Sequence, residues 1–112
     1  QDLNQVFHSV LINAIEAIER KNNPQEPGKI IIRTLFQKEQ IHVHFEDNGD
    51  GMSEDTKSKM FDPFFTTKGT DGKGLGLSIA YGIINEHQGQ VQIISTPTKG
   101  TNFVIILPII LS

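Results

Sequence analysis

Four runs of β-branched and aromatic residues, arranged as two close pairs, constrain the fold of this 112-residue chain more than any other feature. The first pair is KIIIRTLF and QIHVHFED, and the second is VQIIST and NFVIILP. A short polar turn separates the members of each pair, which is typical of an antiparallel hairpin. The sequence therefore predicts two hairpins, and the remaining segments must supply what covers them.

Helical periodicity precedes each predicted hairpin. Apolar residues recur at spacings of three and four, the signature of a helix with one buried stripe, at Leu3, Val6, Phe7, Val10, Leu11, Ala14, Ile15 and Ile18. The same spacing returns at Leu77, Ile79, Ala80, Ile83 and Ile84, with Gly89 as the expected helix end. A short helix is predicted from Ser53 to Met60, where acids come early and lysines late. This order predicts an α/β fold: a two-layer sandwich with helices on one face of a mixed, mainly antiparallel sheet.

Composition limits the chain to one domain and narrows its function. The length and the 37% hydrophobic content suit a single core over residues 1–112. A net charge of -3 without a basic face disfavours nucleic acid as a partner. The absence of cysteine excludes disulfides and thiolate zinc sites and agrees with a cytoplasmic location. Because the chain begins inside an amphipathic pattern at Gln1, we expect a fragment of a longer protein.

The stretch FEDNGDGMSED, residues 45–55, places Asp47 where a strand enters the core. A buried carboxylate is costly unless donors meet it, and an exocyclic amine such as that of adenine would do so. Gly49 and Gly51 would then let backbone N–H groups approach a flat base. The alternative is a simple turn in which Asp47 and Asn48 bond their own backbone.

A second glycine cluster, GKGLGLS at residues 72–78, stands directly before a predicted helix. Backbone N–H groups at a helix start form an anion site suited to phosphates. Neither glycine cluster has the dinucleotide fingerprint or the Walker pattern, which disfavours a P-loop enzyme. The alternative is a flexible hinge. Asn13, on the flank of the first helix, is a candidate oxygen ligand for Mg²⁺, although a helix Asn is more often simply solvated.

In this order, the motifs resemble those of the catalytic, ATP-binding domain of sensor histidine kinases, in the superfamily that also holds gyrase-type and heat-shock chaperone ATPases. QVFHSVLINAIEA resembles the N box, with Asn13 at the magnesium position, and DNGDG resembles the first glycine box, with Asp47 as the adenine-reading carboxylate. FDPFFTTK is similar to the F box and GKGLGLS to the second glycine box. TKGTNFVIILP resembles the closing segment, in which Thr101 would lie near Asp47 and the base.

The resemblance implies a flexible ATP lid from about Met52 to Lys73, with ATP and Mg²⁺ as cofactors. Phe61, Phe64 and Phe65 would anchor this lid to the core. Lys68 and Lys73 would help hold the β- or γ-phosphate, or else remain solvated. The other implied nucleotide contacts are apolar walls from Ala17, Met52 and Leu77, and N–H groups from Gly74, Leu75 and Gly76.

The function that the resemblance implies is the positioning of Mg-ATP for γ-phosphoryl transfer to a histidine on a dimerisation and phosphoacceptor domain. That domain is expected upstream, outside this chain, and the parent protein would pass the phosphoryl group to a response regulator. The parent is expected in the cytoplasm, with or without membrane attachment. None of the histidines stands in the acceptor motif of the family: His8, His42, His44 and His87. We therefore expect a monomeric fragment, the catalytic part of a protein histidine kinase, that binds nucleotide without phosphorylating itself.

Two alternatives stay open at this point. One is a nucleotide-gated switch that closes its lid on a partner without transferring phosphate. The other is a serine-kinase or ATPase relative of the same superfamily. Ser9 stands four residues before Asn13, where hydrolytic relatives carry a water-activating glutamate, and this weakens the ATPase alternative.

Overall fold

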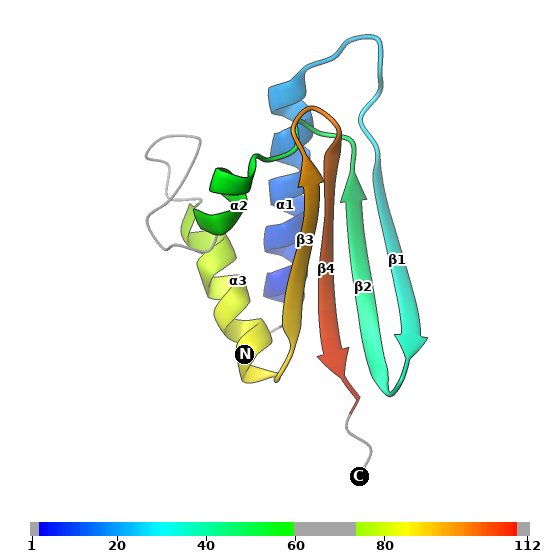
Figure 1. Cartoon of the computed structure of the whole chain (residues 1–112), viewed down its shortest axis with the longest axis vertical. Helices are drawn as coiled ribbons and strands as arrows, with labels where there is room; N and C mark the ends of the chain where they lie inside the picture. The colour runs from blue at the N-terminus through cyan, green and yellow to red at the C-terminus, as the bar shows by residue number, and fades with distance from the viewer. Residues whose placement is uncertain (1–2, 60–73, 110–112) are drawn as a thin grey trace.

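The structure, a computed structural model, describes residues 3–59 and 74–109, in which a strand pair follows α1 and a second strand pair follows α2 and α3 (Figure 1). Helix α1 and helix α3 are long, whereas α2 is a single short helix between them. In chain order the elements are α1 (Leu3–Lys21), β1 (Ile30–Gln37), β2 (Gln40–Asp47), α2 (Glu54–Lys59), α3 (Gly74–Glu86), β3 (Gln90–Thr96) and β4 (Gly100–Pro108).

The strands form one four-stranded sheet in the order β1-β2-β4-β3. The two predicted hairpins, β1 with β2 and β3 with β4, are both present, and β2 pairs with β4 to join them. All three pairings among the described strands are antiparallel. The prediction of a mainly antiparallel sheet is confirmed, and its mixed character does not appear within residues 3–59 and 74–109.

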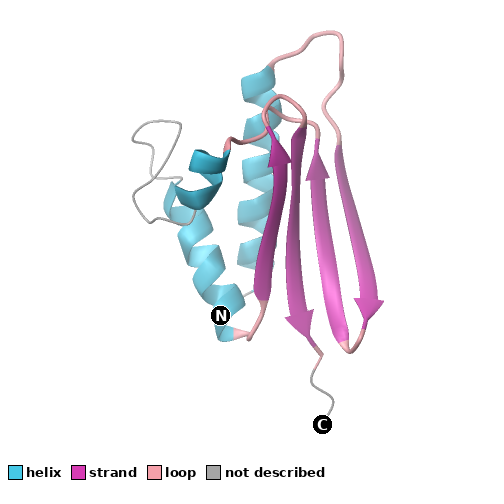
Figure 2. Ribbon diagram, viewed as in Figure 1, coloured by secondary structure: helices cyan, strands magenta, loops and turns pink. Residues whose placement is uncertain are grey.

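Helices α1 and α3 cover one face of this sheet, as Figures 1 and 2 show. The strand residues beneath them share that face because opposite residues of an antiparallel pair point to the same side, as Val43 and Ile105 or Phe45 and Phe103 do. All four are buried. The predicted layer of helices on one face is thus confirmed. The core comprises Val6, Val10, Val43, Phe45, Leu77, Ala80, Ile83, Ile84, Phe103 and Ile105.

The buried stripe of α1 is rotated from the position that the periodicity predicts. Ile15 is 43% exposed, whereas Glu16 is 9% exposed. The reason is that the second half of α1 turns Ala17 toward the loop after β2, where a Cβ on Gly49 would lie 2.6 Å from that of Ala17. A similar departure occurs in α3, where Ile79 is 48% exposed. Periodicity identifies a helix, but packing decides which edge of its apolar stripe is buried.

The short helix α2 begins one residue after the predicted start, because Ser53 acts as its cap. The Ser53 hydroxyl accepts a hydrogen bond from the backbone N–H of Thr56 at 3.2 Å, a typical N-cap contact. Met60, its predicted last residue, lies outside the described residues. Helix α3 ends at Glu86, three residues before the predicted end at Gly89. The residue with a left-handed backbone after this helix is Gln88, with φ of 62°, and not Gly89.

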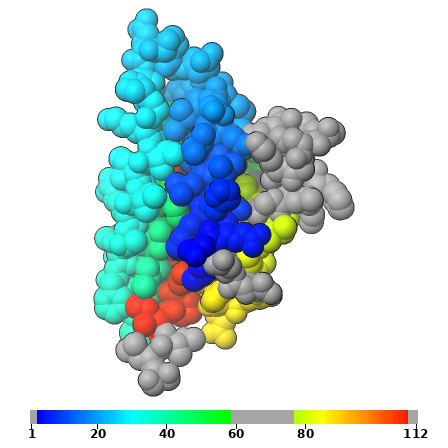
Figure 3. Space-filling model, turned by 180° about the vertical axis from the view of Figure 1, so that it is seen from behind, coloured from blue at the N-terminus to red at the C-terminus, as the bar shows by residue number. Residues whose placement is uncertain are grey.

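Strand β1 lies at the edge of the sheet, beside the helix layer rather than beneath it (Figure 3). On its helix side, Ile32 is 53% and Phe36 is 68% exposed. The two helices therefore cover β2, β4 and β3 but leave β1 open. None of the helices in the described part of the chain is both long and apolar enough to cross a membrane.

Candidate functional site

Asp47 is the last residue of β2 and lies at the end of the sheet where the chain turns toward α2. It pairs with Thr101 of β4 and with Ile30 of β1, so its side chain shares the helix-covered face with both. Asp47 is half-buried and Thr101 is buried. The structure thus places Thr101 beside Asp47, where the sequence motif suggests it.

The Asp47 carboxylate already has backbone N–H partners from Gly49 and Thr101. The backbone N–H of Gly49 donates to Asp47 Oδ1 over 2.8 Å, which is the turn contact of the alternative interpretation. Burial raises the pKa of Asp47 above its ordinary value of 3.8, and the nearby Asp50 adds to this effect. Backbone bonds from Gly49 and Thr101, and the charge of Arg20, lower it in part. A carboxylate has about four acceptor positions, so a turn contact and a ligand contact are compatible.

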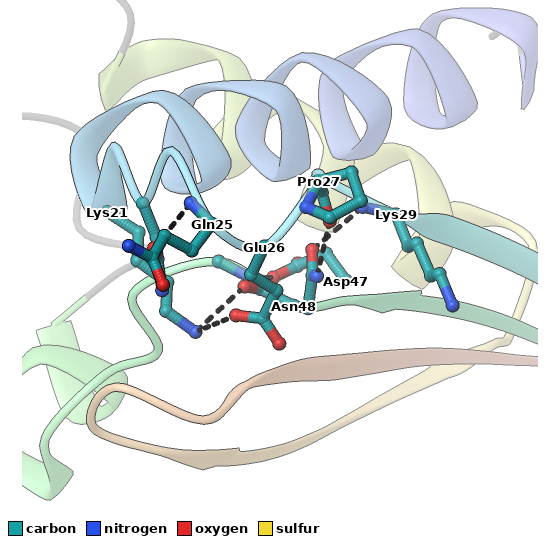
Figure 4. Close-up of polar contacts among 9 residues, drawn as sticks. Lys21, Gln25, Glu26, Pro27, Lys29, Asp47 and Asn48 are labelled. Atoms are coloured by element: carbon teal, nitrogen blue, oxygen red, sulfur yellow. Dashed lines mark hydrogen bonds and ion pairs between the residues drawn. The ribbon is translucent and has the colours of Figure 1, made fainter.

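Asn48 does not bond its own backbone, contrary to the turn interpretation. Its amide Nδ2 donates to the carbonyl of Pro27 at 2.9 Å, and its Oδ1 accepts from the N–H of Lys29 at 2.8 Å (Figure 4). Lys21 Nζ donates to the Asn48 carbonyl at 3.3 Å and pairs with Glu26 at 3.0 Å. Asn48 therefore fastens the connection between α1 and β1 to the end of β2.

The glycines after Asp47 serve close packing as well as loop shape. Gly49 is buried against α1, where a Cβ would lie 2.7 Å from the backbone carbon of Ala17. Gly51 has φ of 69°, and a Cβ there would clash with the carbonyl oxygen of Thr96. The expectation that both glycines are there to admit a base is therefore incomplete, because each position excludes a side chain even without a ligand.

Ser95 is a site residue that the sequence analysis missed. Its Oγ accepts from the backbone N–H of Met52 at 2.8 Å, donates to the carbonyl of Gly100 at 2.9 Å, and lies 2.8 Å from Thr101 Oγ1. The alternation of VQIIST could have located it, since Ser95 shares the inner face with Val91 and Ile93. Through Ser95, the Thr101 hydroxyl is tied to the start of the predicted lid.

Helix α1 presents Asn13 and Ala17 on one side, one turn apart. Ala17 is 4% exposed and packs on Gly49, and Asn13 is half-buried. At a rise of 1.5 Å per residue, four residues place Asn13 about 6 Å along the axis from Ala17. Asn13 is therefore on the same side of α1 as Ala17, one turn closer to the start of the helix.

The described part of the second glycine cluster, residues 74–78, belongs to α3, and Gly72 lies outside the described residues. The helix starts at Gly74, so Gly74, Leu75 and Gly76 form its first turn. N–H groups of a first turn lack partners within the helix and attract anions. Leu77 follows, 8% exposed within the core, and Met52 packs partly buried against the same core. Lys68, Lys73 and the three phenylalanines of the F-box-like segment lie outside the described residues.

The comparisons with known proteins agree with this geometry. Residues 1–110 match the family described as histidine kinase-, DNA gyrase B- and HSP90-like ATPase. The signal transduction histidine-protein kinase AtoS of Escherichia coli (strain K12) is 44% identical over 108 residues, 96% of this chain and 17% of AtoS. Sporulation kinase E of Bacillus subtilis (strain 168) is 42% identical over 109 residues, 96% of this chain and 14% of that kinase. The chain therefore spans less than a fifth of these relatives.

Among solved structures, the catalytic domain of histidine kinase ThkA superposes with a TM-score of 0.75 and 38% identity. The match covers 93% of this chain and 64% of the ThkA chain. The fold expected for such a domain is thus confirmed. With a family match over nearly its whole length and the same fold as a histidine kinase catalytic domain, the chain belongs to the family of histidine kinase-, DNA gyrase B- and HSP90-like ATPases.

Proposed function

We propose that this chain is the ATP-binding catalytic domain of a two-component sensor histidine kinase. It would position Mg-ATP so that the γ-phosphoryl group reaches a histidine on a separate domain. The observation that carries the proposal is the half-buried Asp47 beside Thr101 at the end of the sheet. The chain around it matches this family over residues 1–110.

The purine end of the nucleotide would lie against Asp47. Its carboxylate accepts a hydrogen bond from the exocyclic amine of adenine, which guanine lacks at that position. Thr101 stands next to this contact on β4. Ala17, Met52 and Leu77 supply apolar surface for the base, and Gly49 and Gly51 shape the turn beneath it.

The phosphates would lie between the two long helices. The N–H groups of Gly74, Leu75 and Gly76 favour anions at the start of α3, and Lys68 and Lys73 add positive charge. Asn13 contributes an amide oxygen to Mg²⁺, a hard ion that takes oxygen ligands and leaves other positions to water and phosphate. The ion, when bound, supplies charge neutralisation; the chain's own residues orient the triphosphate.

The acceptor histidine belongs to another domain under this proposal. The two relatives described above are named as a histidine-protein kinase and a sporulation kinase, and this chain spans 17% and 14% of them. We place a dimerisation and phosphoacceptor domain upstream, a response regulator as the recipient, and the parent protein's kinase part in the cytoplasm. The fragment itself would be a monomer.

A calorimetric titration with ATP, with and without Mg²⁺, tests the proposal when it is read against GTP. ATP should bind, Mg²⁺ should tighten binding, and GTP should bind far more weakly. Asn13→Ala should lose the response to Mg²⁺, whereas Asn85→Ala, a matched change at an exposed position of α3, should keep it. Equal affinity for ATP and GTP would argue against adenine recognition by Asp47.

Phosphoryl transfer needs a second experiment. A phosphoacceptor domain from a related sensor kinase, added in trans with labelled ATP, should become labelled on histidine. Steady release of phosphate without labelling would instead favour the ATPase alternative. Tight nucleotide binding with neither outcome would favour the nucleotide-gated switch.

A further inference from the structure

Arg20 and Asp50 form a bidentate ion pair between the last turn of α1 and the turn after β2. Arg20 Nε lies 2.8 Å from Asp50 Oδ2, and Nη2 lies 3.2 Å from Oδ1. The two side chains are 31% and 32% exposed. A guanidinium and a carboxylate that meet through two bonds fix orientation as well as distance.

The backbone of Asp50 joins two other segments at the same place. Its N–H donates to the carbonyl of Ala17 at 3.1 Å, and its carbonyl accepts from the N–H of Thr98 at 2.7 Å. Helix α1, the glycine turn and the β3–β4 turn therefore all meet at Asp50. This turn lies directly between Asp47 and Met52, which hold the proposed purine site.

We propose that Arg20 is a positioning residue for the purine site: it holds the glycine turn against α1 and compensates the charge of Asp50 beside Asp47. The proposal rests on the proposed function, in which the ionised Asp47 accepts the adenine amine more strongly than the protonated form does. It adds a residue and an acid–base behaviour that the glycine-box motif does not contain. Arg20 itself need not touch the nucleotide.

The charges around Asp47 make this role testable. Burial is the main cause that raises the pKa of Asp47, Asp50 raises it further, and Arg20 lowers it. Arg20 and Asp50 are the charged side chains whose effect on Asp47 is resolved; its partners in the sheet, Ile30 and Thr101, are uncharged, and α1 also carries the buried acid Glu16. The two members of the pair therefore have opposite effects on the same carboxylate.

Opposite effects give opposite predictions. In Arg20→Gln, the pKa of Asp47 should rise, so the loss of ATP affinity in acid should begin at higher pH. In Asp50→Asn, the pKa should fall, so the loss should begin at lower pH. A role limited to bracing the turn would instead shift both variants alike. On the pH plateau we expect each variant to lose at most about fivefold in affinity, as for a partly exposed ion pair.

The experiment measures the Asp47 carboxyl carbon by NMR during a pH titration of the nucleotide-free domain, and then ATP affinity across the same pH range. Arg33→Gln is the matched control, because Arg33 pairs with Glu46 at 3.6 Å on the other face of the sheet, and it should change neither curve. Shifts of the Asp47 titration in the same direction in both variants, or no shift, would overturn the proposal.

The NMR titration separates this proposal from the proposed function, because it needs no nucleotide. If the wild type fails to bind ATP at any pH, the proposed function is wrong, and with it the purine-site role of Arg20. If the wild type binds ATP and both pH profiles match that of the wild type, only the inference about Arg20 is wrong.

Discussion

Replacing Asp47 with Asn is the most direct perturbation of the proposed site, because it removes a charge while keeping the shape. Asn retains an Oδ1 atom that can accept the hydrogen bond from the Gly49 N–H, which is 2.8 Å long in the wild type. It replaces the second carboxylate oxygen with an NH₂ group. That group is a donor, and it would face the amine of adenine, which is also a donor.

The expected loss follows from the bond that disappears. A hydrogen bond to a charged group contributes roughly 1.5–3 kcal/mol, which corresponds to about a 10- to 150-fold weaker binding of ATP. GTP binding, already weak, should change much less. The selectivity between the two nucleotides should therefore shrink together with the affinity for ATP.

Stability should move in the opposite direction. Because the pKa of Asp47 is raised in the folded protein, the carboxylate is less favourable there than in the unfolded chain. This destabilisation is absent below the ordinary value of 3.8, grows as pH rises through the interval up to the folded pKa, and is fully present above it. Without nucleotide, Asp47→Asn should thus be more stable than the wild type at pH 7, and the difference should vanish in strong acid.

Two measurements check this prediction: isothermal titration with ATP, and thermal unfolding across pH with and without ATP. Saturating ATP should reverse the order of stability, since a ligand at 100 times its Kd stabilises by about 2.7 kcal/mol. Glu46→Gln is the control, because Glu46 is the adjacent carboxylate but lies on the opposite face of the sheet, paired with Arg33. Unchanged ATP affinity in Asp47→Asn, or a loss of equal size in Glu46→Gln, would refute the reasoning.

Two further predictions concern the packing around the site and are read by chemical unfolding. Gly49→Ala should destabilise the folded protein by roughly 1–3 kcal/mol, because the new methyl group would meet the backbone of Ala17. Gly82→Ala, which has open space around it in α3, should stabilise the folded protein by roughly 0.5–1 kcal/mol. Equal effects of the two substitutions would contradict this account. Ser95→Ala should cost roughly 1–3 kcal/mol and weaken ATP binding, because the Met52 N–H loses its acceptor, and Ser95→Thr should rescue both. A Ser95→Ala variant as stable as the wild type would be evidence against the hydroxyl network.

Local sequence signals predict the elements well because each reflects a period that one segment carries by itself. The spacing of Val6, Val10 and Ala14 identifies α1, and the alternation of Val43 and Phe45 identifies the buried face of β2. The motifs around Asp47 and Gly74 locate the end of a strand and the start of a helix. These are properties of neighbouring residues, so no knowledge of the packing is needed to read them.

Contacts between distant segments are different. Arg20 and Asp50 are 30 residues apart, and Met52 and Ser95 are 43 apart, and neither pair leaves a periodic trace in the sequence. The same holds for Gly49, whose need for a missing side chain arises only where the loop meets Ala17. Such contacts depend on which face each element turns toward the others.

The sequence by itself determined the order of helices and hairpins, the single core and the positions of the two glycine-rich motifs, because propensity and periodicity act within short segments. Only the tertiary structure decided that Glu16 is buried and Ile15 exposed. The same holds for the hydrogen bonds of Ser95 with Thr101 and Met52, and for the ion pair of Arg20 with Asp50. These outcomes depend on the register between strands and on the rotation of α1 against the sheet. Both are fixed by the summed packing of the whole domain, which no single segment encodes.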